Sequence, residues 1–134
     1  MSLEIRERER EGVKVLDLKG RLVAGNEAGM LRDRAREIAT PSPLNAILNL
    51  AELDYIDSTG LGVLTIFYTT LRKGGGTLKL LNLNRRNIEL LILTKLSTVF
   101  EVFNDEQDAV NSFFPDRELK RFDILSFVQS RQKL

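Results

Sequence analysis

The residues whose types and spacing could support chemistry are Asp57, Ser58 and Thr59, in the segment DYIDSTGLGVL. A carboxylate and two hydroxyls stand directly before two glycines, Gly60 and Gly62. The apolar run LNAILNL precedes this segment and LGVLTIFY follows it, which predicts a junction between a buried strand and a helix. In sheets whose strands alternate with helices, functional groups collect at such junctions.

Two interpretations of this junction are open. In the first, Asp57 or Ser58 only caps the helix by accepting hydrogen bonds from its free backbone N–H groups. In the second, the junction is a chemical site, because a cap does not require Gly60 and Gly62. Each glycine weakens a helix interior by about 1 kcal/mol relative to alanine. Their missing side chains would let another molecule approach Ser58, although they would also permit close packing of the helix on the sheet.

The composition argues against an enzyme. The 134 residues include no histidine and no cysteine, so the usual general base, the usual partner of a nucleophilic serine and the reactive thiolate are absent. The segments IDSTG, RKGGGTLK and GLG lack the spacings of a hydrolase elbow, a P-loop and a dinucleotide-binding turn. Asp54 and Asp57 alone are too few ligands for a metal ion. We therefore expect no catalytic site, no metal and no cofactor.

Charge and hydropathy limit the partners. There are 20 basic and 19 acidic residues, a net charge of +1, which gives no general attraction to nucleic acid or to anionic lipid. No apolar run is long enough to span a bilayer, and the start MSLEIRERER is charged from its fourth residue. The sequence therefore predicts a soluble cytoplasmic protein whose partners are neither nucleic acids nor membranes.

The elements that must position the junction alternate along the chain. We expect strands at residues 2–11, 13–20, 44–50, 77–83 and 98–103, and helices at residues 27–40, 58–72, 84–96 and 104–114. The first two strands would form a hairpin, and the apolar alternation of the second slips in phase after Val15. Asn26 is expected to cap the first helix, Asn104 or Asp105 the last, and left-handed glycine in KGGG to end the second. This order predicts an α/β fold with a mixed, mostly parallel five-stranded sheet and about four helices.

The C-terminal segment beyond Pro115 is predicted to be an appended amphipathic helix, from about residue 117 to 132. Its apolar residues recur at spacings of three: Leu119, Phe122, Leu125 and Val128. This stripe either docks on its own domain as a fifth helix or mediates a homodimer.

A resemblance to a known family adds to this interpretation. The segments AILNLAELDYIDSTGLGVL, GGGTLKLLNL and LTKLSTVFEVF closely resemble the STAS family, the anti-sigma-factor antagonists of bacteria. The resemblance covers about residues 3–114, its most specific motif is D-S-x-G-L-G, and it leaves residues 115–134 as an extension. It implies a STAS-like single domain with four helices and a mixed sheet, in agreement with the element order.

The resemblance also implies a function. In this family the motif serine is phosphorylated by an anti-sigma factor that is also a serine kinase. The unphosphorylated antagonist binds that kinase and frees a sigma factor for transcription, and the phosphorylated antagonist is released. Ser58 matches the acceptor, with Thr59 as the alternative, and Asp57, Gly60 and Gly62 match the partner-binding positions beside it.

The chain departs from the family pattern after its second strand. Many antagonists carry there an aspartate that contacts the kinase, whereas this chain has GRLV, with Val23 at that position. Asn26 and Glu27 follow, and Glu27 is the candidate substitute for the missing acid. An alternative function is therefore a STAS subunit of a larger sensory or stress-signalling assembly, without direct anti-sigma antagonism.

Overall fold

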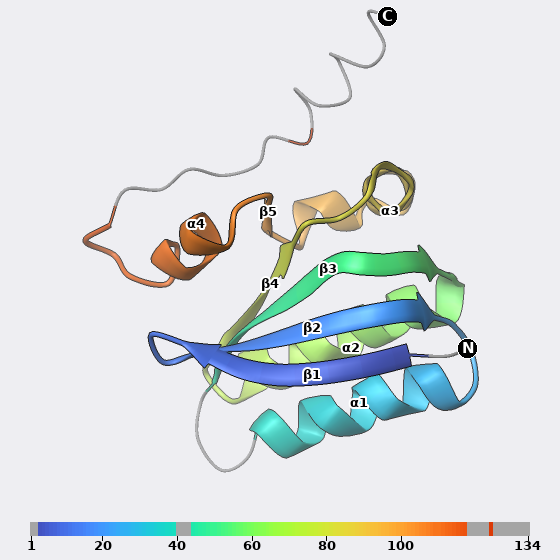
Figure 1. Ribbon diagram of the computed structural model, residues 1–134, viewed down its shortest axis with the longest axis horizontal. Helices are drawn as coiled ribbons and strands as arrows, with labels where there is room; N and C mark the ends of the chain where they lie inside the picture. The colour runs from blue at the N-terminus through green and yellow to red at the C-terminus, as the bar shows by residue number, and fades with distance from the viewer. Residues whose placement is uncertain (1–2, 40–43, 118–123, 125–134) are drawn as a thin grey trace, which may run out of the picture.

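The computed structural model describes residues 3–39, 44–117 and 124 (Figure 1). Its strands are β1 (Leu3–Arg10), β2 (Val13–Leu22), β3 (Asn45–Ile56), β4 (Thr77–Leu81) and β5 (Val102–Phe103). Its helices are α1 (Asn26–Ala39), α2 (Ser58–Lys73), α3 (Arg85–Leu93) and α4 (Glu106–Asn111), with the short 3-10 helix η1 (Leu96–Thr98) before β5. The expected α/β fold with a mixed five-stranded sheet and four helices is confirmed.

The sheet has the order β1-β2-β3-β4-β5. Strand β1 pairs antiparallel with β2, as expected for the hairpin, and all further pairs are parallel. The carboxyl ends of β2, β3 and β4 therefore lie at the same edge of the sheet, where α1 and α2 also begin (Figure 1). This edge holds the polar junction at Asp57.

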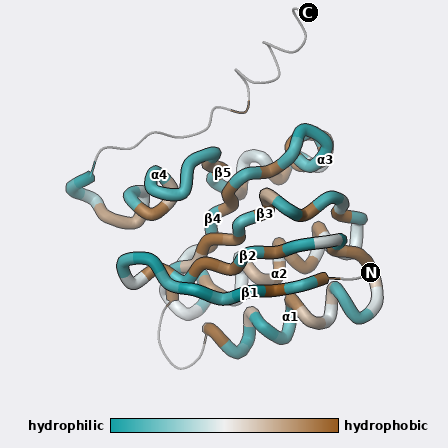
Figure 2. Tube along the Cα trace, viewed as in Figure 1, coloured by the Kyte–Doolittle hydropathy of each residue, from teal (hydrophilic) through white to brown (hydrophobic). Residues whose placement is uncertain are grey.

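Two apolar cores lie on opposite faces of the sheet. The larger one is enclosed by the sheet and by α1 and α2, and includes Leu48, Leu64 and Phe67. The smaller one lies under α4 and includes Ile47, Phe103 and Val110. Figure 2 shows the result along the chain: β1 is largely hydrophilic, whereas the inner strands carry long hydrophobic stretches.

The two cores explain the irregular apolar pattern of β2. Val13 and Val15 are buried in the smaller core, and Leu16 and Leu18 are buried in the larger one. Successive side chains point to opposite faces, so the slip in the apolar pattern marks the change from the smaller core to the larger one. The strand is covered on both faces, and each face follows its own alternation.

Several boundaries differ from those expected. Strand β3 continues to Ile56 through polar residues. Strand β5 has only two residues, because Lys95 adopts a left-handed conformation, φ 64°, and the chain then folds into η1. Phe100 is thereby buried, with its ring 5.4 Å from that of Tyr68 in an edge-on arrangement.

The helix ends also differ in part. Helix α1 begins at Asn26 itself rather than after it, and the N–H of Ala28 donates to the Val23 carbonyl at 3.1 Å. Asp105, and not Asn104, caps α4. Gly74 at the end of α2 has φ −86°, so the left-handed residue is Gly75, at φ 92°. The predicted C-terminal helix with its apolar stripe lies outside the described residues, apart from Arg117 and Ile124.

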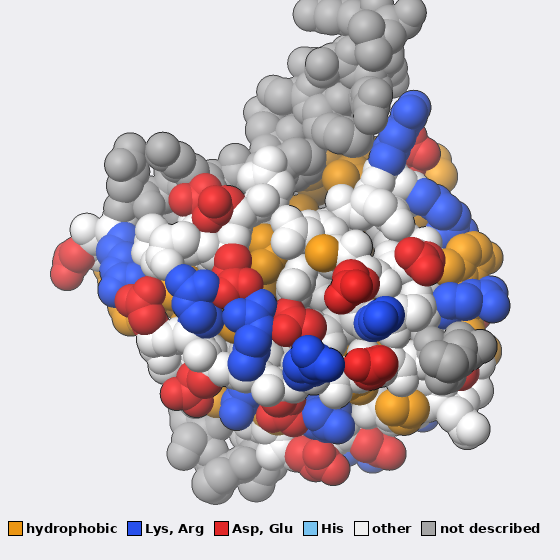
Figure 3. Space-filling view, viewed as in Figure 1, with side chains coloured by type: hydrophobic (Ala, Val, Ile, Leu, Met, Phe, Trp, Pro, Cys, Tyr) orange, Lys and Arg blue, Asp and Glu red, His pale blue; other side chains and the backbone are white. Residues whose placement is uncertain are grey.

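The face of the sheet away from α1 and α2 is strongly polar over β1 and β2, where acidic and basic side chains are interspersed (Figure 3). A shallow groove of 430 Å³ crosses it. Arg8 binds Asp17 there through two hydrogen bonds, of 2.7 and 3.0 Å, and reaches Glu106 of α4 at 2.6 and 2.8 Å. The central charges of this groove are therefore paired within the chain.

Candidate functional site at the start of α2

Asp57 is the residue that caps α2. Its backbone is extended, and one carboxylate oxygen, Oδ1, accepts from the Gly60 N–H at 2.7 Å. The other oxygen, Oδ2, accepts from the Ala24 N–H at 2.9 Å, across the loop that follows β2. The Asp57 N–H donates to the Leu22 carbonyl at 3.2 Å. Asp57 thus joins the start of α2 to the end of β2, and the first interpretation of the junction is correct for this residue.

These contacts also fix the charge of Asp57. The Gly60 N–H, the Ala24 N–H and, more weakly, the charge of Arg21 hold the pKa of this carboxyl below its usual range. Asp57 is therefore ionised at neutral pH, and the first turn of α2 already carries an anion of the chain itself.

Ser58 and Thr59 form the first turn of α2, and both are exposed. In the part of the chain that the structure describes, neither hydroxyl makes a hydrogen bond. Because Asp57 performs the capping, the Ser58 hydroxyl is available to another molecule. The same holds for Thr59, the second candidate acceptor.

Gly60 and Gly62 have different environments. A Cβ at Gly60 would lie 2.2 Å from the Leu22 carbonyl oxygen, so this glycine permits the close packing of α2 on β2. A Cβ at Gly62 would meet no atom of residues 3–39, 44–117 and 124 within 4 Å, and Gly62 is exposed. The packing of α2 on β2 therefore requires a glycine at position 60, whereas no contact among the described residues requires one at position 62.

Asn26 and Glu27 lie at the same edge of the sheet, in the first turn of α1. Asn26 is exposed and Glu27 is half-buried, with its Oε1 facing Gly25 in the loop after β2. That loop also contains Val23, and it is held to α2 by Asp57. The structure therefore gathers the predicted site residues at one edge, in two adjacent helix starts.

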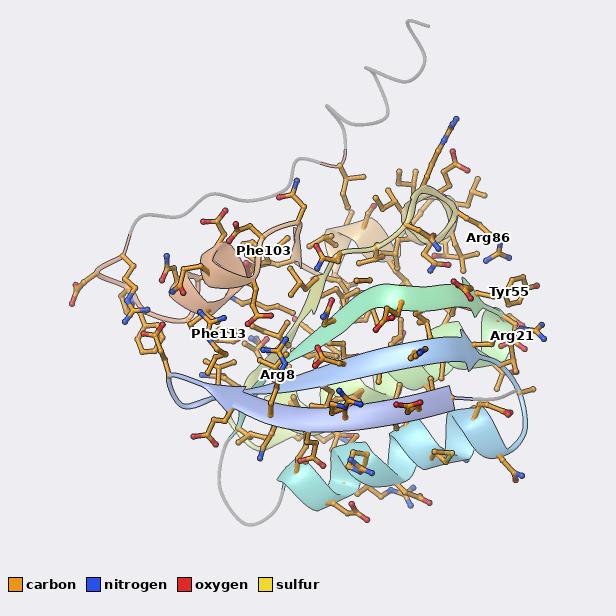
Figure 4. The ribbon with its side chains drawn as sticks, viewed as in Figure 1. Arg8, Arg21, Tyr55, Arg86, Phe103 and Phe113 are labelled. Carbon is orange, nitrogen blue, oxygen red and sulfur yellow. The ribbon has the colours of Figure 1, made fainter. Side chains whose placement is uncertain are left out.

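Three further residues at this edge were not predicted from the sequence. Tyr55 lies between the guanidinium groups of Arg21 and Arg86, whose central carbons are 5.2 and 3.9 Å from the centre of its ring (Figure 4). Arg21 on β2 and Tyr55 on β3 are register partners. Tyr55 lies two residues before Asp57, where the motif begins. The signal in the sequence was a tyrosine just before Asp57 and an arginine at the expected end of the second strand.

In residues 3–39, 44–117 and 124, no three acidic side chains come together in a way that could hold a metal ion. No helix in that part of the chain is long and apolar enough to cross a bilayer.

The sequence of this chain is similar to those of known anti-sigma-B factor antagonists. An anti-sigma-B factor antagonist from Bacillus subtilis (strain 168) is 42% identical over 53 residues, which cover 40% of this chain and 49% of that protein. That match thus spans about half the length of the relative. An anti-sigma-B factor antagonist from Listeria monocytogenes is 29% identical over 106 residues, or 79% of this chain and 91% of that protein.

Solved structures share the fold. An anti-sigma factor antagonist from Mycobacterium paratuberculosis superposes with a TM-score of 0.71 at 21% identity, over 83% of this chain and 93% of that one. The antagonist SpoIIAA in its unphosphorylated form gives a TM-score of 0.64 at 17% identity, over 85% of this chain and 99% of that one. The model of the STAS domain matches residues 4–109. The chain therefore belongs to the STAS domain family.

Proposed function

We propose that this protein is an anti-sigma-factor antagonist that is switched by phosphorylation. Its unphosphorylated form would bind an anti-sigma factor that is also a serine kinase, and so release a sigma factor. Ser58 would be the phosphate acceptor. In this proposal the chain is a ligand and a substrate of the kinase and not itself an enzyme.

The main observation behind the proposal is that Asp57 and Ser58 have different roles at the start of α2. Asp57 satisfies the helix end, which leaves the Ser58 hydroxyl exposed and without a partner among the described residues. The relatives from Bacillus subtilis and Listeria monocytogenes are named anti-sigma-B factor antagonists. SpoIIAA, which shares the fold, has been solved in a phosphorylated form as well.

Gly62 supports a docking surface beside Ser58. A glycine in an exposed helix interior costs stability, and here no neighbouring atom of the described residues demands it. One turn further along α2, Ile66 is 41% exposed. A bare backbone next to an apolar side chain is a surface on which the partner could pack closely, with Ser58 at its end.

The switch would act through charge. A phosphate adds about −1.5 to −2 charges at neutral pH, next to the ionised Asp57. The fold should tolerate this, because Ser58 lies on the surface. A partner that packs on α2 would be repelled, and a loss of about 3 kcal/mol would weaken binding roughly 150-fold.

The test is a pull-down from the native organism with the wild type, Ser58→Ala and Ser58→Asp, and with Thr59→Ala as the matched control. We expect the wild type and Ser58→Ala to retain a kinase-type anti-sigma factor, and Ser58→Asp to lose it while melting at a similar temperature. Incubation with that kinase and ATP should add one phosphate, which mass spectrometry should map to Ser58.

Other outcomes contradict parts of the proposal. Phosphate on Thr59 would transfer the acceptor role to that residue. Equal capture by the wild type and Ser58→Asp would remove charge repulsion as the switch. Recovery of a large particle without a sigma-factor regulator would favour the alternative of a subunit in a sensory assembly.

A further inference from the structure

The cluster of Arg21, Tyr55 and Arg86 lies beside the proposed phosphorylation site, and its two arginines are held differently. Arg86 donates to the Ile56 carbonyl and to the Asn87 side chain, both at 3.4 Å, and lies 3.9 Å from the Tyr55 ring centre. Arg21 lies further from that ring, at 5.2 Å, and is exposed. Within the described residues its guanidinium makes no hydrogen bond and no ion pair. Its charge acts on Asp57, whose pKa it helps to lower, but among the described residues no direct contact to a polar group holds it. Arg21 is therefore held less closely in this cluster than Arg86.

A phosphate on Ser58 would need a positive charge that the helix start does not supply. The Gly60 N–H already binds the Asp57 carboxylate, and the Asp57 N–H donates to the Leu22 carbonyl at 3.2 Å. The donors that usually favour an anion at a helix start are thus partly used. Asp57 is ionised, so the phosphate would stand next to a like charge.

We propose that Arg21 is the counter-ion of the phosphorylated Ser58, and that phosphorylation draws its guanidinium from the face of Tyr55 to the phosphate. Arg86 remains on Tyr55 and keeps the ring in place. This inference rests on the proposed function, which makes Ser58 the acceptor. Arginine suits the role because its planar group can donate two parallel hydrogen bonds to a phosphate.

The geometry supports this movement. Leu22, the residue after Arg21, accepts the Asp57 N–H, so Arg21 projects from the strand end that contacts the motif. Figure 4 shows Arg21, Tyr55 and Arg86 together at the end of β2 and β3. A charge-assisted hydrogen bond to a phosphate is stronger than a contact between an exposed cation and a ring. Phosphorylation would then alter the surface of β2 as well as that of α2.

The experiment uses the full chain with phosphoserine placed at position 58 by genetic encoding, so that no kinase is needed. Phosphorus NMR then follows the second ionisation of the phosphate as a function of pH. We expect Arg21→Gln to raise this pKa by roughly 0.5–1 unit relative to the wild type, because a nearby cation favours the dianion. Arg86→Gln is the matched control and should change it by less than about 0.2 unit.

The other charged groups at this edge are the same in all variants. Asp57 and Glu27 raise the pKa of the phosphate in each protein, so their effects cancel in the comparison. In the wild type, the ring protons of Tyr55 should shift on phosphorylation, with those of Tyr68 as the internal reference. In Arg21→Gln the shift of Tyr55 should be much smaller.

An equal phosphate pKa in the wild type and Arg21→Gln, with both proteins folded by thermal melting, would overturn the proposal. Equal effects of Arg21→Gln and Arg86→Gln would overturn it too, since the phosphate pKa would then depend on the net charge nearby and not on a contact with Arg21. Failure of the proposed function is distinguishable, because a chain that no kinase phosphorylates would still show the titration difference.

Discussion

Gly60 and Gly62 lie two residues apart on α2, yet the structure gives them opposite roles. Gly60 is buried against the Leu22 carbonyl, whereas Gly62 faces open space. The sequence offered two reasons for these glycines, access for a partner and close packing on the sheet. Close packing holds for Gly60, and access for a partner stays the proposal for Gly62.

Alanine at each position separates these roles. We expect Gly62→Ala to raise the free energy of unfolding by about 0.5–1 kcal/mol, because alanine favours a helix and nothing obstructs its methyl group. The same change should weaken partner binding. Gly60→Ala should instead destabilise the domain by about 2 kcal/mol or more, since its methyl group would overlap a backbone oxygen.

Urea unfolding gives both stabilities, and titration with the captured partner gives the affinity. A Gly62→Ala variant that gains stability and binds as tightly as the wild type would contradict a partner contact at this position.

At the scale of the elements, Arg8 connects β1 to β2 and to α4. Its guanidinium binds Asp17 and Glu106, and Arg10 also binds Glu106. Arg8 lowers the pKa of both carboxyls, chiefly through hydrogen bonds to their side chains. This network fixes α4 over the smaller core, at the sheet face opposite to α1 and α2.

These lowered pKa values predict a specific response to acid. A carboxyl with a lowered folded pKa, such as that of Asp17 or Glu106, stabilises the protein above its unfolded pKa and loses this effect as the pH falls through the folded value. Wild-type stability should therefore fall steeply below about pH 4.

Arg8→Met should reduce the free energy of unfolding by about 1–2 kcal/mol at pH 7, because both carboxylates keep other partners and are partly exposed. It should also flatten the loss of stability between pH 5 and about pH 3. Arg85→Met is the control, since the ion pair of Arg85 with Glu89, at 3.1 Å, is exposed and involves neither Asp17 nor Glu106. An unchanged acid profile in Arg8→Met would show that other carboxyls control this transition.

At the scale of the whole molecule, the described residues of the C-terminal extension contact the STAS domain. Ile124, the described residue beyond 117, is half-buried against the larger core. Before it, Arg117 binds Glu11 at 2.7 Å and lies 4.1 Å from the centre of the Phe114 ring. These contacts favour docking of the extension on its own domain, although a homodimer remains the alternative.

Truncation after Arg117 tests this. The shortened chain should stay folded and keep the oligomeric state of the full chain in solution. It should melt roughly 3–6 °C lower, because even one partly buried isoleucine contributes about 1 kcal/mol. A dimeric full chain that becomes monomeric on truncation would instead assign the extension to an interface. A truncation that changes neither the oligomeric state nor the melting temperature would show that the extension contributes nothing.

The sequence by itself determined the order of the elements, the hairpin at the start and the junction at Asp57, because apolar periodicity and capping residues are local signals. It could not separate the two cores, since β2 is apolar on both faces and its pattern looks like an irregular single face. It also could not show that β5 is two residues long, because η1 depends on burying Phe100 against Tyr68.

At the site, local sequence proposed Asp57 or Ser58 as the cap, and the tertiary structure decided for Asp57. The reason is that its second oxygen binds Ala24, a residue 33 positions earlier in the loop that follows the neighbouring strand β2. Likewise, Arg21, Tyr55 and Arg86 are far apart in the chain and meet only because parallel strands end at one edge. Contacts of this range follow from strand order and register, which residue types and spacing alone do not encode.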